Sequence, residues 1–230
     1  MDSIRSCAGD PRLEPVAAQL IEAAAALCAR GWMLGTSGSV SARLGRDPLQ
    51  IAVTVSGKDK GQLSTADLLC VTDDGAVFDT LGDPRASSES LFAGVPRPSG
   101  ETLVHEAVYR RFPEAGAVMH VHSVDNTLAS FLVEPGARLP FGDLEMIKGL
   151  GRWQAGEVVS IPVVENLRDI PALARAVAAA ADPEVPGVLV RGHGTYVWGP
   201  DVERARRHTE ILEFLLSFEI KARMLGLAGL

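Results

Sequence analysis

Apolar residues recur at helical spacing along several stretches of this chain. The two longest are residues 13–30, an alanine-rich segment that Gly31 follows at a helix C-cap position, and residues 201–225 near the end of the sequence. Both segments have an apolar side that is expected to lie against other parts of the fold. Shorter stretches predict further helices at residues 101–112, 124–132, 144–150 and 170–181.

Short apolar or alternating runs between these helices predict β-strands. The turn signal Asp73-Asp74-Gly75 predicts a hairpin between residues 68–71 and 76–78. Residues 82–100 are rich in Gly, Pro, Ser and charged residues, which is typical of an irregular loop. The remaining predicted strands cover residues 49–55, 117–122, 158–163, 185–190 and 195–198.

The order of these elements indicates the fold class. Strands and helices intermix without a regular βαβ period, so we expect an α/β protein, built as a single-domain α/β/α sandwich around a mixed, largely antiparallel central sheet. No internal repeat or linker divides the chain. We therefore expect residues 13–230 to form one domain and residues 1–12 to form a flexible N-terminus.

Composition narrows the classes of function. The net charge of −7 over 230 residues argues against a sequence-independent nucleic-acid binder, because such proteins cluster Lys and Arg. No apolar run approaches the roughly 18 residues that span a bilayer, and the N-terminus lacks a signal-peptide core. The three cysteines are odd in number and lack CxxC spacing. They predict a reducing compartment without a disulfide framework, and hence a soluble, cytoplasmic protein.

Two histidines one residue apart are the most informative chemical feature. His120 and His122 end an apolar run, and side chains on a strand alternate between faces, so both imidazoles are expected on one side of a sheet. His193 follows another apolar run, between Gly192 and Gly194. Three imidazoles that leave coordination positions open are the pattern of a catalytic zinc site. The alternative is that they are ordinary packed or surface side chains.

Three clusters of small residues indicate a phosphate site. Glycine lets backbone N–H groups approach an anion closely, and serine hydroxyls add hydrogen bonds. Each cluster alone is equally compatible with an ordinary turn. The candidate phosphate-binding residues are Gly38, Ser39, Ser56, Gly57, Lys58, Ser99 and Gly100.

In this order, the motifs resemble the class II (zinc) sugar-phosphate aldolase superfamily over about residues 14–225. The resemblance rests on residues 35–43, Val55-Ser56-Gly57-Lys58, Pro98-Ser99-Gly100-Glu101 and the three histidines. Within the superfamily, residues 56–61, 145–149 and 191–199 resemble the methylthioribulose-1-phosphate dehydratase branch. This resemblance implies a class II aldolase-like fold, one Zn²⁺ per subunit, a small phosphorylated ketose as substrate, and a homotetramer with sites near subunit contacts.

The resemblance also implies an activity, the dehydration of 5-methylthioribulose 1-phosphate in methionine salvage. It assigns the acid/base role first to Glu145, with Glu101 as the rival because it occupies the place of the catalytic glutamate in the related aldolases. The chain departs from the superfamily at Ser39, where Asn is common. It also has Glu101 at about the place where related animal enzymes carry a cysteine.

Two other functions stay open at this stage. An aldolase or epimerase acting on another ketose phosphate would use Glu101 as its main acid/base. A non-catalytic binding protein on the same fold is the alternative of another class. The remaining conspicuous side chains are expected to be structural: His105 and His208 in packing, surface or subunit contacts, and Tyr196 and Trp198 in the core or an interface.

Overall fold

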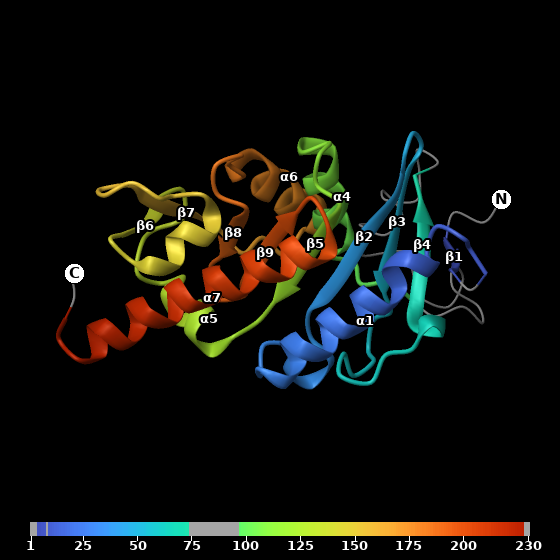
Figure 1. Cartoon of the computed structure of the whole chain (residues 1–230), viewed down its shortest axis with the longest axis horizontal. Coiled ribbons are helices and arrows are strands. Elements are labelled where there is room, and N and C mark those ends of the chain that lie inside the picture. The colour runs from blue at the N-terminus through green and yellow to red at the C-terminus, as the bar shows by residue number, and fades with distance from the viewer. Residues whose placement is uncertain (1–3, 8, 74–96, 228–230) are drawn as a thin grey trace.

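The computed structural model describes residues 4–7, 9–73 and 97–227. Its strands are β1 (Ile4–Ser6), β2 (Ser39–Arg46), β3 (Leu49–Thr54), β4 (Leu68–Thr72), β5 (Ala117–Val121), β6 (Arg138–Gly142), β7 (Val158–Val164), β8 (Gly187–Val190) and β9 (Gly194–Gly199). Within the described residues they form one nine-stranded sheet in the order β1-β4-β3-β2-β5-β9-β8-β7-β6 (Figure 1). Neighbouring strands are antiparallel except β7 and β8, which are parallel.

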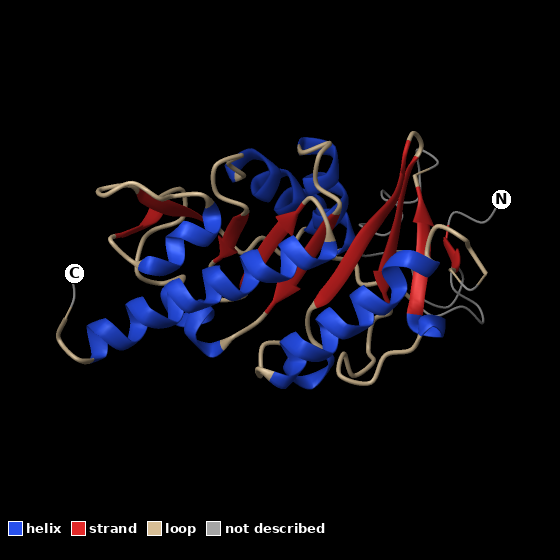
Figure 2. Cartoon of the chain, in the orientation of Figure 1, coloured by secondary structure: helices blue, strands red, loops and turns tan. Residues whose placement is uncertain are grey.

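Helices cover both faces of this sheet (Figures 1 and 2). Helices α1 (Glu14–Ala29) and α7 (Val202–Met224) lie on one face, and α4 (Thr102–Arg111) and α6 (Ile170–Ala180) lie on the other. A short helix, α5 (Val124–Ala129), follows β5, and three 3-10 turns are η1 (Leu34–Thr36), η2 (Thr65–Asp67) and η3 (Glu145–Leu150). The expected α/β sandwich with a mixed, largely antiparallel sheet is confirmed. None of the described helices has both the length and the apolar character needed to cross a membrane.

Cover on both faces explains why the central strands read as apolar runs rather than as alternating ones. Every residue of β5 is buried. Val118 packs with the core under α4 and α6, whereas Met119 and Val121 pack with the core under α1. Polar residues on such a strand are therefore surrounded by protein on either face, and they require partners.

The helices and most strands match their expected positions to within a few residues. Among the elements that the apolar pattern did not reveal are β1 and β6. Residues 1–12 were expected to be flexible, yet β1 pairs with β4. Strand β6 is the last strand of the sheet and contains Pro140, a residue that strands tolerate at an edge. The expected strand at residues 76–78 and most of the expected loop at 82–100 lie outside the described residues.

The expectation that the chain has no disulfide was wrong. Cys7 and Cys70 form a disulfide whose Cα atoms lie 5.0 Å apart, while Cys28 is free. The two cysteines are 63 residues apart in sequence, so no spacing motif marks them. They meet because β1 pairs with β4, and this pairing brings Cys7 alongside the strand that carries Cys70.

This disulfide predicts a thiol count. Protein unfolded without reductant should contain one reactive thiol, that of Cys28. Cys7→Ser should lower the free energy of unfolding by about 4 kcal/mol, because a loop of this length gains that much entropy in the unfolded chain when the bond is lost. Cys28→Ser is the matched control and should change stability little. Three reactive thiols in the unreduced protein would contradict the bond.

Candidate metal centre

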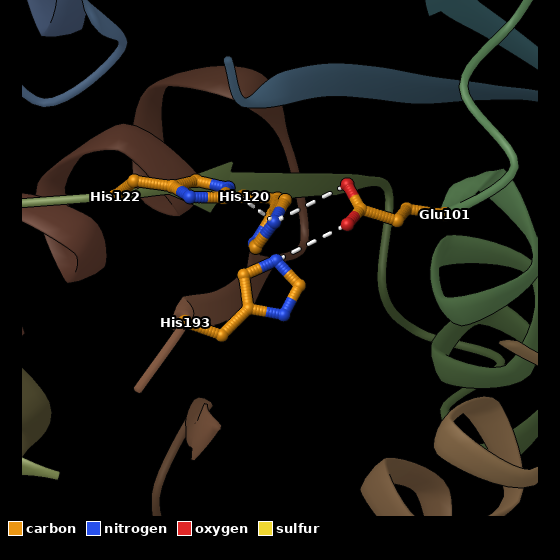
Figure 3. A group of neighbouring side chains, drawn as sticks. All are labelled: Glu101, His120, His122 and His193. Atoms are coloured by element: carbon orange, nitrogen blue, oxygen red, sulfur yellow. Dashed lines mark hydrogen bonds and ion pairs between the residues drawn. The ribbon is translucent and has the colours of Figure 1, made fainter. Parts of the chain in front are cut away.

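The register of the central strands brings three imidazoles together (Figure 3). His120 lies on β5, His122 lies one residue beyond its end, and His193 lies in the tight turn between β8 and β9. Because β9 pairs with both β5 and β8, that turn opens next to the end of β5. The ring centroids of the three histidines are 4.4, 4.8 and 5.0 Å apart.

Hydrogen bonds behind the rings fix which nitrogens face the centre. Nδ1 of His120 donates to the carbonyl of Thr195 over 3.2 Å, and Nδ1 of His193 donates to Oδ1 of Asn166 over 3.3 Å. The Nε2 atoms are thereby left as free acceptors. Burial, reinforced by the neighbouring imidazoles, lowers the pKa of His122 to about 3. His122 is therefore neutral at physiological pH, and a neutral imidazole is the form that ligates metals.

Glu101 is the fourth member of the group. It stands at the start of α4, and its carboxylate oxygens lie 3.1 Å from Nε2 of His193 and 3.4 Å from Nε2 of His120. Burial alone would raise the pKa of Glu101, but His120 and His193, where their Nε2 atoms carry protons, outweigh burial and hold that pKa well below its ordinary value. A carboxylate thus adds negative charge to a cluster of nitrogen lone pairs.

This donor set fits a divalent cation. The four ligand atoms all lie within 4.8 Å of one another, and Nε2 of His120 is only 2.8 Å from Nε2 of His122. At that separation one nitrogen donates a proton to the other, and a bound cation would take the place of that shared proton. Ligands bonded at about 2.1 Å to a tetrahedral zinc ion lie roughly 3.4 Å apart, so small side-chain rotations would complete such a site.

The first candidate phosphate loop lies directly beside His120. Gly38 has φ +74°, and a Cβ there would come within 2.7 Å of the His120 carbonyl oxygen, so only glycine fits. Ser39 pairs with His120 across β2 and β5. Ser39 is buried, and its hydroxyl lies 2.9 Å from Nε2 of His105. Its side chain is therefore already engaged inside the protein.

The second and third loops lie side by side. A β-bridge joins Val55 to Pro98, and the N–H of Ser56 donates to the Arg97 carbonyl over 2.7 Å. Ser99 accepts a 3.2 Å hydrogen bond from the backbone of Glu101, which connects the third loop to the cluster. Along these loops the structure leaves Ser56, Gly57 and Lys58 exposed, and Ser99 and Gly100 half-buried.

Lys60 lies buried between two of the loops, and the sequence analysis did not single it out. Its buried ammonium group donates to the Thr36 carbonyl over 3.1 Å and to the Lys58 carbonyl over 2.9 Å, so it connects the first and second loops. Burial lowers the pKa of Lys60. The charge expected from Lys58 is instead paired with Asp67 at 2.6 Å. The available signal was the position of Lys60 within the motif at residues 56–61.

Glu145 is not part of this cluster within the subunit. It begins η3, its side chain is 82% exposed, and it pairs with Lys148 at 2.8 Å. Both residues line an open pocket of about 250 Å³ whose wall also includes Trp153. Of the two glutamates that the sequence suggested, the structure brings only Glu101 into contact with the histidines.

A second missed residue supports the site from the opposite face of the sheet. Glu213, buried on α7, accepts hydrogen bonds from Ser123 at 2.5 Å and Asn126 at 2.7 Å, and from Thr195 at 3.3 Å. Burial raises the pKa of Glu213. Ser123 follows His122 directly, and the Thr195 carbonyl holds His120. A charged residue among the apolar positions of α7 was the signal for this role.

The conspicuous aromatic and histidine residues have mainly structural positions. Tyr196 is fully buried and stacks on His120 with ring centroids 3.9 Å apart, and Trp198 stacks on Phe112. His208 is half-buried and bonds to the Trp198 carbonyl at 2.8 Å. His105 is fully buried, as a packed histidine would be, but both of its ring nitrogens have hydrogen-bond partners.

Comparison with known proteins agrees with this geometry. Residues 18–220 match the family described as Class II Aldolase and Adducin N-terminal domain. The chain is 40% identical to a methylthioribulose-1-phosphate dehydratase of Geobacillus kaustophilus, covering 92% of this chain and 94% of the relative. It is 39% identical to the protein of the same name from Stenotrophomonas maltophilia, covering 93% and 94% of the two chains.

A solved structure shares the architecture. L-fuculose-1-phosphate aldolase from Thermus thermophilus superimposes with a TM-score of 0.69 and 26% identity, covering 94% of this chain and 99% of the aldolase. The residues that match the family, 18–220, include all three histidines and Glu101. The chain therefore belongs to the family of class II aldolases and adducin N-terminal domains.

Proposed function

We propose that this chain catalyses the zinc-dependent dehydration of 5-methylthioribulose 1-phosphate to 2,3-diketo-5-methylthiopentyl 1-phosphate, a hydro-lyase reaction of methionine salvage. The observation that carries the proposal is the convergence of three imidazoles and one carboxylate beside loops of glycine and serine. Relatives named methylthioribulose-1-phosphate dehydratase, which align with most of this chain, support the choice of substrate.

The residues that would hold zinc are His120, His122 and His193, with Glu101 as a further oxygen donor. When bound, the ion would supply Lewis-acid stabilisation for negative charge that develops on the ketone and a neighbouring hydroxyl of the substrate. The protein contributes the orientation of the donors. Thr195 and Asn166 accept the Nδ1 protons and keep the free Nε2 atoms of His120 and His193 turned inward.

The proposed reaction is an elimination without redox change. The C2 ketone acidifies the C3 proton, which a protein base removes. The C4–O bond then breaks, and the hydroxyl leaves as water after it receives a proton from an acid. The resulting enol becomes the 2,3-diketone when its proton moves to carbon. One carboxylate can serve as the base first and as the acid afterwards.

We propose Glu101 as this carboxylate, because it is the one in contact with the imidazoles. To take the C3 proton, one oxygen of this carboxylate would have to leave the imidazoles and turn toward the substrate. Glu145, which the family resemblance favours, is the alternative. It is exposed and paired with Lys148, and it would need a rearrangement or a neighbouring subunit to reach the histidines.

Phosphate binding would rely mainly on backbone groups. Gly57 is exposed and has φ +72°, a conformation that favours glycine and that occurs in anion-binding loops. Ser56, Ser99 and Gly100 would complete the second and third loops, and Lys58 would add charge if it exchanged Asp67 for the phosphate. Gly38 and Ser39 would contribute backbone at the first loop, since the Ser39 hydroxyl is engaged by His105.

The proposal includes assembly and location. Val124, Leu128 and Phe131 project from α5 and the turn after it, are 48–71% exposed and lie beside the metal centre, which supports a homotetramer with subunit contacts there. A phosphorylated metabolite as substrate supports a cytoplasmic location. The Cys7–Cys70 bond would then have to form in a reducing compartment, where structural disulfides are rare.

A second candidate function is aldol cleavage of another ketose phosphate. The contact of Glu101 with the histidines favours it, because the resemblance gives a glutamate at this place the acid/base role in the aldolases. Metal binding is common to the two reactions, so metal content alone does not separate them. The substrate and the product are the discriminating measurements.

The metal ligands can be tested by removing one imidazole. His120→Ala and His122→Ala should each abolish stoichiometric zinc, measured by atomic emission, and should abolish turnover with it. His208→Ala is the matched control, because it removes a half-buried imidazole that bonds only a backbone carbonyl in the described structure. Full turnover by a zinc-free His120→Ala protein would rule out the assigned site.

The reaction itself can be tested with zinc-loaded protein and two substrates. Methylthioribulose 1-phosphate should give the diketone, measured by its absorbance, and a chelator should stop the reaction until zinc is restored. Cleavage of fuculose 1-phosphate without diketone formation would move the chain to the aldolases. Stoichiometric zinc with neither reaction would favour the non-catalytic alternative.

The two carboxylates can be separated by isosteric substitution. Glu101→Gln should lower kcat by at least roughly a hundredfold, because it removes the group that moves the C3 proton. Glu145→Gln should change kcat by less than about fivefold, since its carboxylate lies outside the cluster in this subunit. The reverse result would assign the proton transfer to Glu145.

A further inference from the structure

Helix α4 presents a polar stripe to the sheet. Glu101, His105 and Tyr109 follow one another at intervals of four residues, so their side chains project from the same side of the helix. Glu101 reaches the histidine cluster, whereas His105 and Tyr109 are fully buried. A polar stripe against an apolar sheet is costly unless each of its groups has a partner.

His105 meets that requirement with both ring nitrogens. Its Nε2 lies 2.9 Å from the hydroxyl of Ser39, and its Nδ1 lies 2.7 Å from the hydroxyl of Ser41. The Ser41 hydroxyl is also 2.8 Å from the hydroxyl of Tyr109. A continuous chain of hydrogen bonds therefore fastens α4 to strand β2.

The protonation state of His105 suits this bridge. Burial is the main cause that lowers the pKa of His105 to about 3. The neutral ring donates from one nitrogen and accepts at the other, and each serine hydroxyl can take the complementary role. Both contacts are thus satisfied without a buried charge.

The location of the bridge connects it to the metal centre. Ser39 on β2, His120 on β5 and Tyr196 on β9 occupy directly opposed positions on three adjacent strands. The His120 ring lies between the other two side chains on the face that α4 covers. The bridge thus holds α4 to the strand next to His120, one helical turn from Glu101.

The position of Glu101 depends on the first turn of α4, whose Leu103 and Val104 pack in the core and which the bridge fastens to β2. Glu101 is the first residue before α4, where helix ends fray, and no side-chain cap is present at that position. Its backbone N–H donates to the Ser99 hydroxyl at 3.2 Å, a contact within its own loop. Apart from its contacts with the histidines, the position of the carboxylate is therefore set by where the first turn of α4 lies on the sheet.

We propose that His105 is a positioning residue, which bridges Ser39 and Ser41 and thereby holds the carboxylate of Glu101 against His120 and His193. The inference rests on the proposed role of Glu101 in the metal site. It gives a role to His105, which contacts neither the donor atoms of the metal ligands nor the exposed groups of the candidate phosphate loops. It also gives the serine at position 39 a task of its own, as the anchor of this imidazole.

A double-mutant cycle on zinc affinity tests the proposal without any assay of turnover. Four proteins are compared by competition with a chromophoric chelator: the unmodified chain, His105→Phe, Glu101→Gln and the double variant. His105→Phe should weaken zinc binding about tenfold, the effect expected of a residue that orients a ligand. In the Glu101→Gln background the same change should weaken it less than about twofold, because the group being positioned is already altered.

Conservative replacement separates positioning from general damage to the core. His105→Gln keeps one donor and one acceptor that can reach two hydroxyls, so it should restore most of the affinity that phenylalanine removes. His208→Phe is the matched control and should leave zinc affinity unchanged in both backgrounds. If His105→Phe does not fold, Ser39→Ala replaces it in the cycle, with the same expected dependence on Glu101.

Two results would overturn the proposal: no loss of zinc affinity on replacing His105, or an equal loss whether residue 101 is Glu or Gln. The diketone assay tests the proposed reaction separately from this cycle. Coupling between positions 105 and 101 in a protein that forms no diketone would leave the inference intact and refute the dehydratase. Diketone formation together with additive effects of the two substitutions on zinc affinity would support the dehydratase and overturn the positioning role of His105.

Discussion

The antiparallel pairing of β5 with β9 is the interaction on which the metal centre depends. It sets His120 opposite Tyr196 and brings the turn that carries His193 to the end of β5. Gly194 allows the close approach of β9 to β5, because a Cβ there would lie 2.3 Å from the Val121 carbonyl oxygen. A slip of one residue would turn His120 toward α7 and dismantle the cluster.

Each face of this strand pair then contributes a different kind of support. On the α4 side, Glu101 and the imidazoles make the group that can bind a cation. On the α7 side, Glu213 accepts hydrogen bonds from Ser123, Asn126 and Thr195. Ser123 follows His122 in sequence, and the Thr195 carbonyl accepts the hydrogen bond of His120. Because α7 spans the sheet, a single helix couples the position of both strands to the hydrophobic core.

Features of the fold that depend only on neighbouring residues could be predicted from the sequence. The period of two along residues 117–122 predicted that His120 and His122 share a face, and apolar runs located the central strands and the long helices. The order of the glycine and serine loops ahead of the histidines pointed to the family before any coordinates were known. These features need only neighbouring residues to be interpreted.

Features that depend on contacts between distant segments were not accessible in this way. His105 meets Ser39 and Ser41 across 64–66 residues of sequence, and its helix alone gives no sign of that meeting. Strand β6 is interrupted by Pro140, which weakens its pattern, and the disulfide follows from the pairing of an edge strand three residues long. The sequence motifs favoured Glu145 over Glu101, and only three-dimensional distances show that Glu101 is the one in contact with the histidines.

The convergence of free nitrogen lone pairs and a carboxylate has a consequence for the lifetime of the protein in a cell. An ion that binds these donors only in the folded chain shifts the folding equilibrium toward the folded state. At a free ion concentration about one hundred times the dissociation constant, this linkage contributes about 2.7 kcal/mol. Such a difference changes the fraction of chains open to proteases severalfold or more. Metal supply would thus govern how many copies survive as well as how many are active.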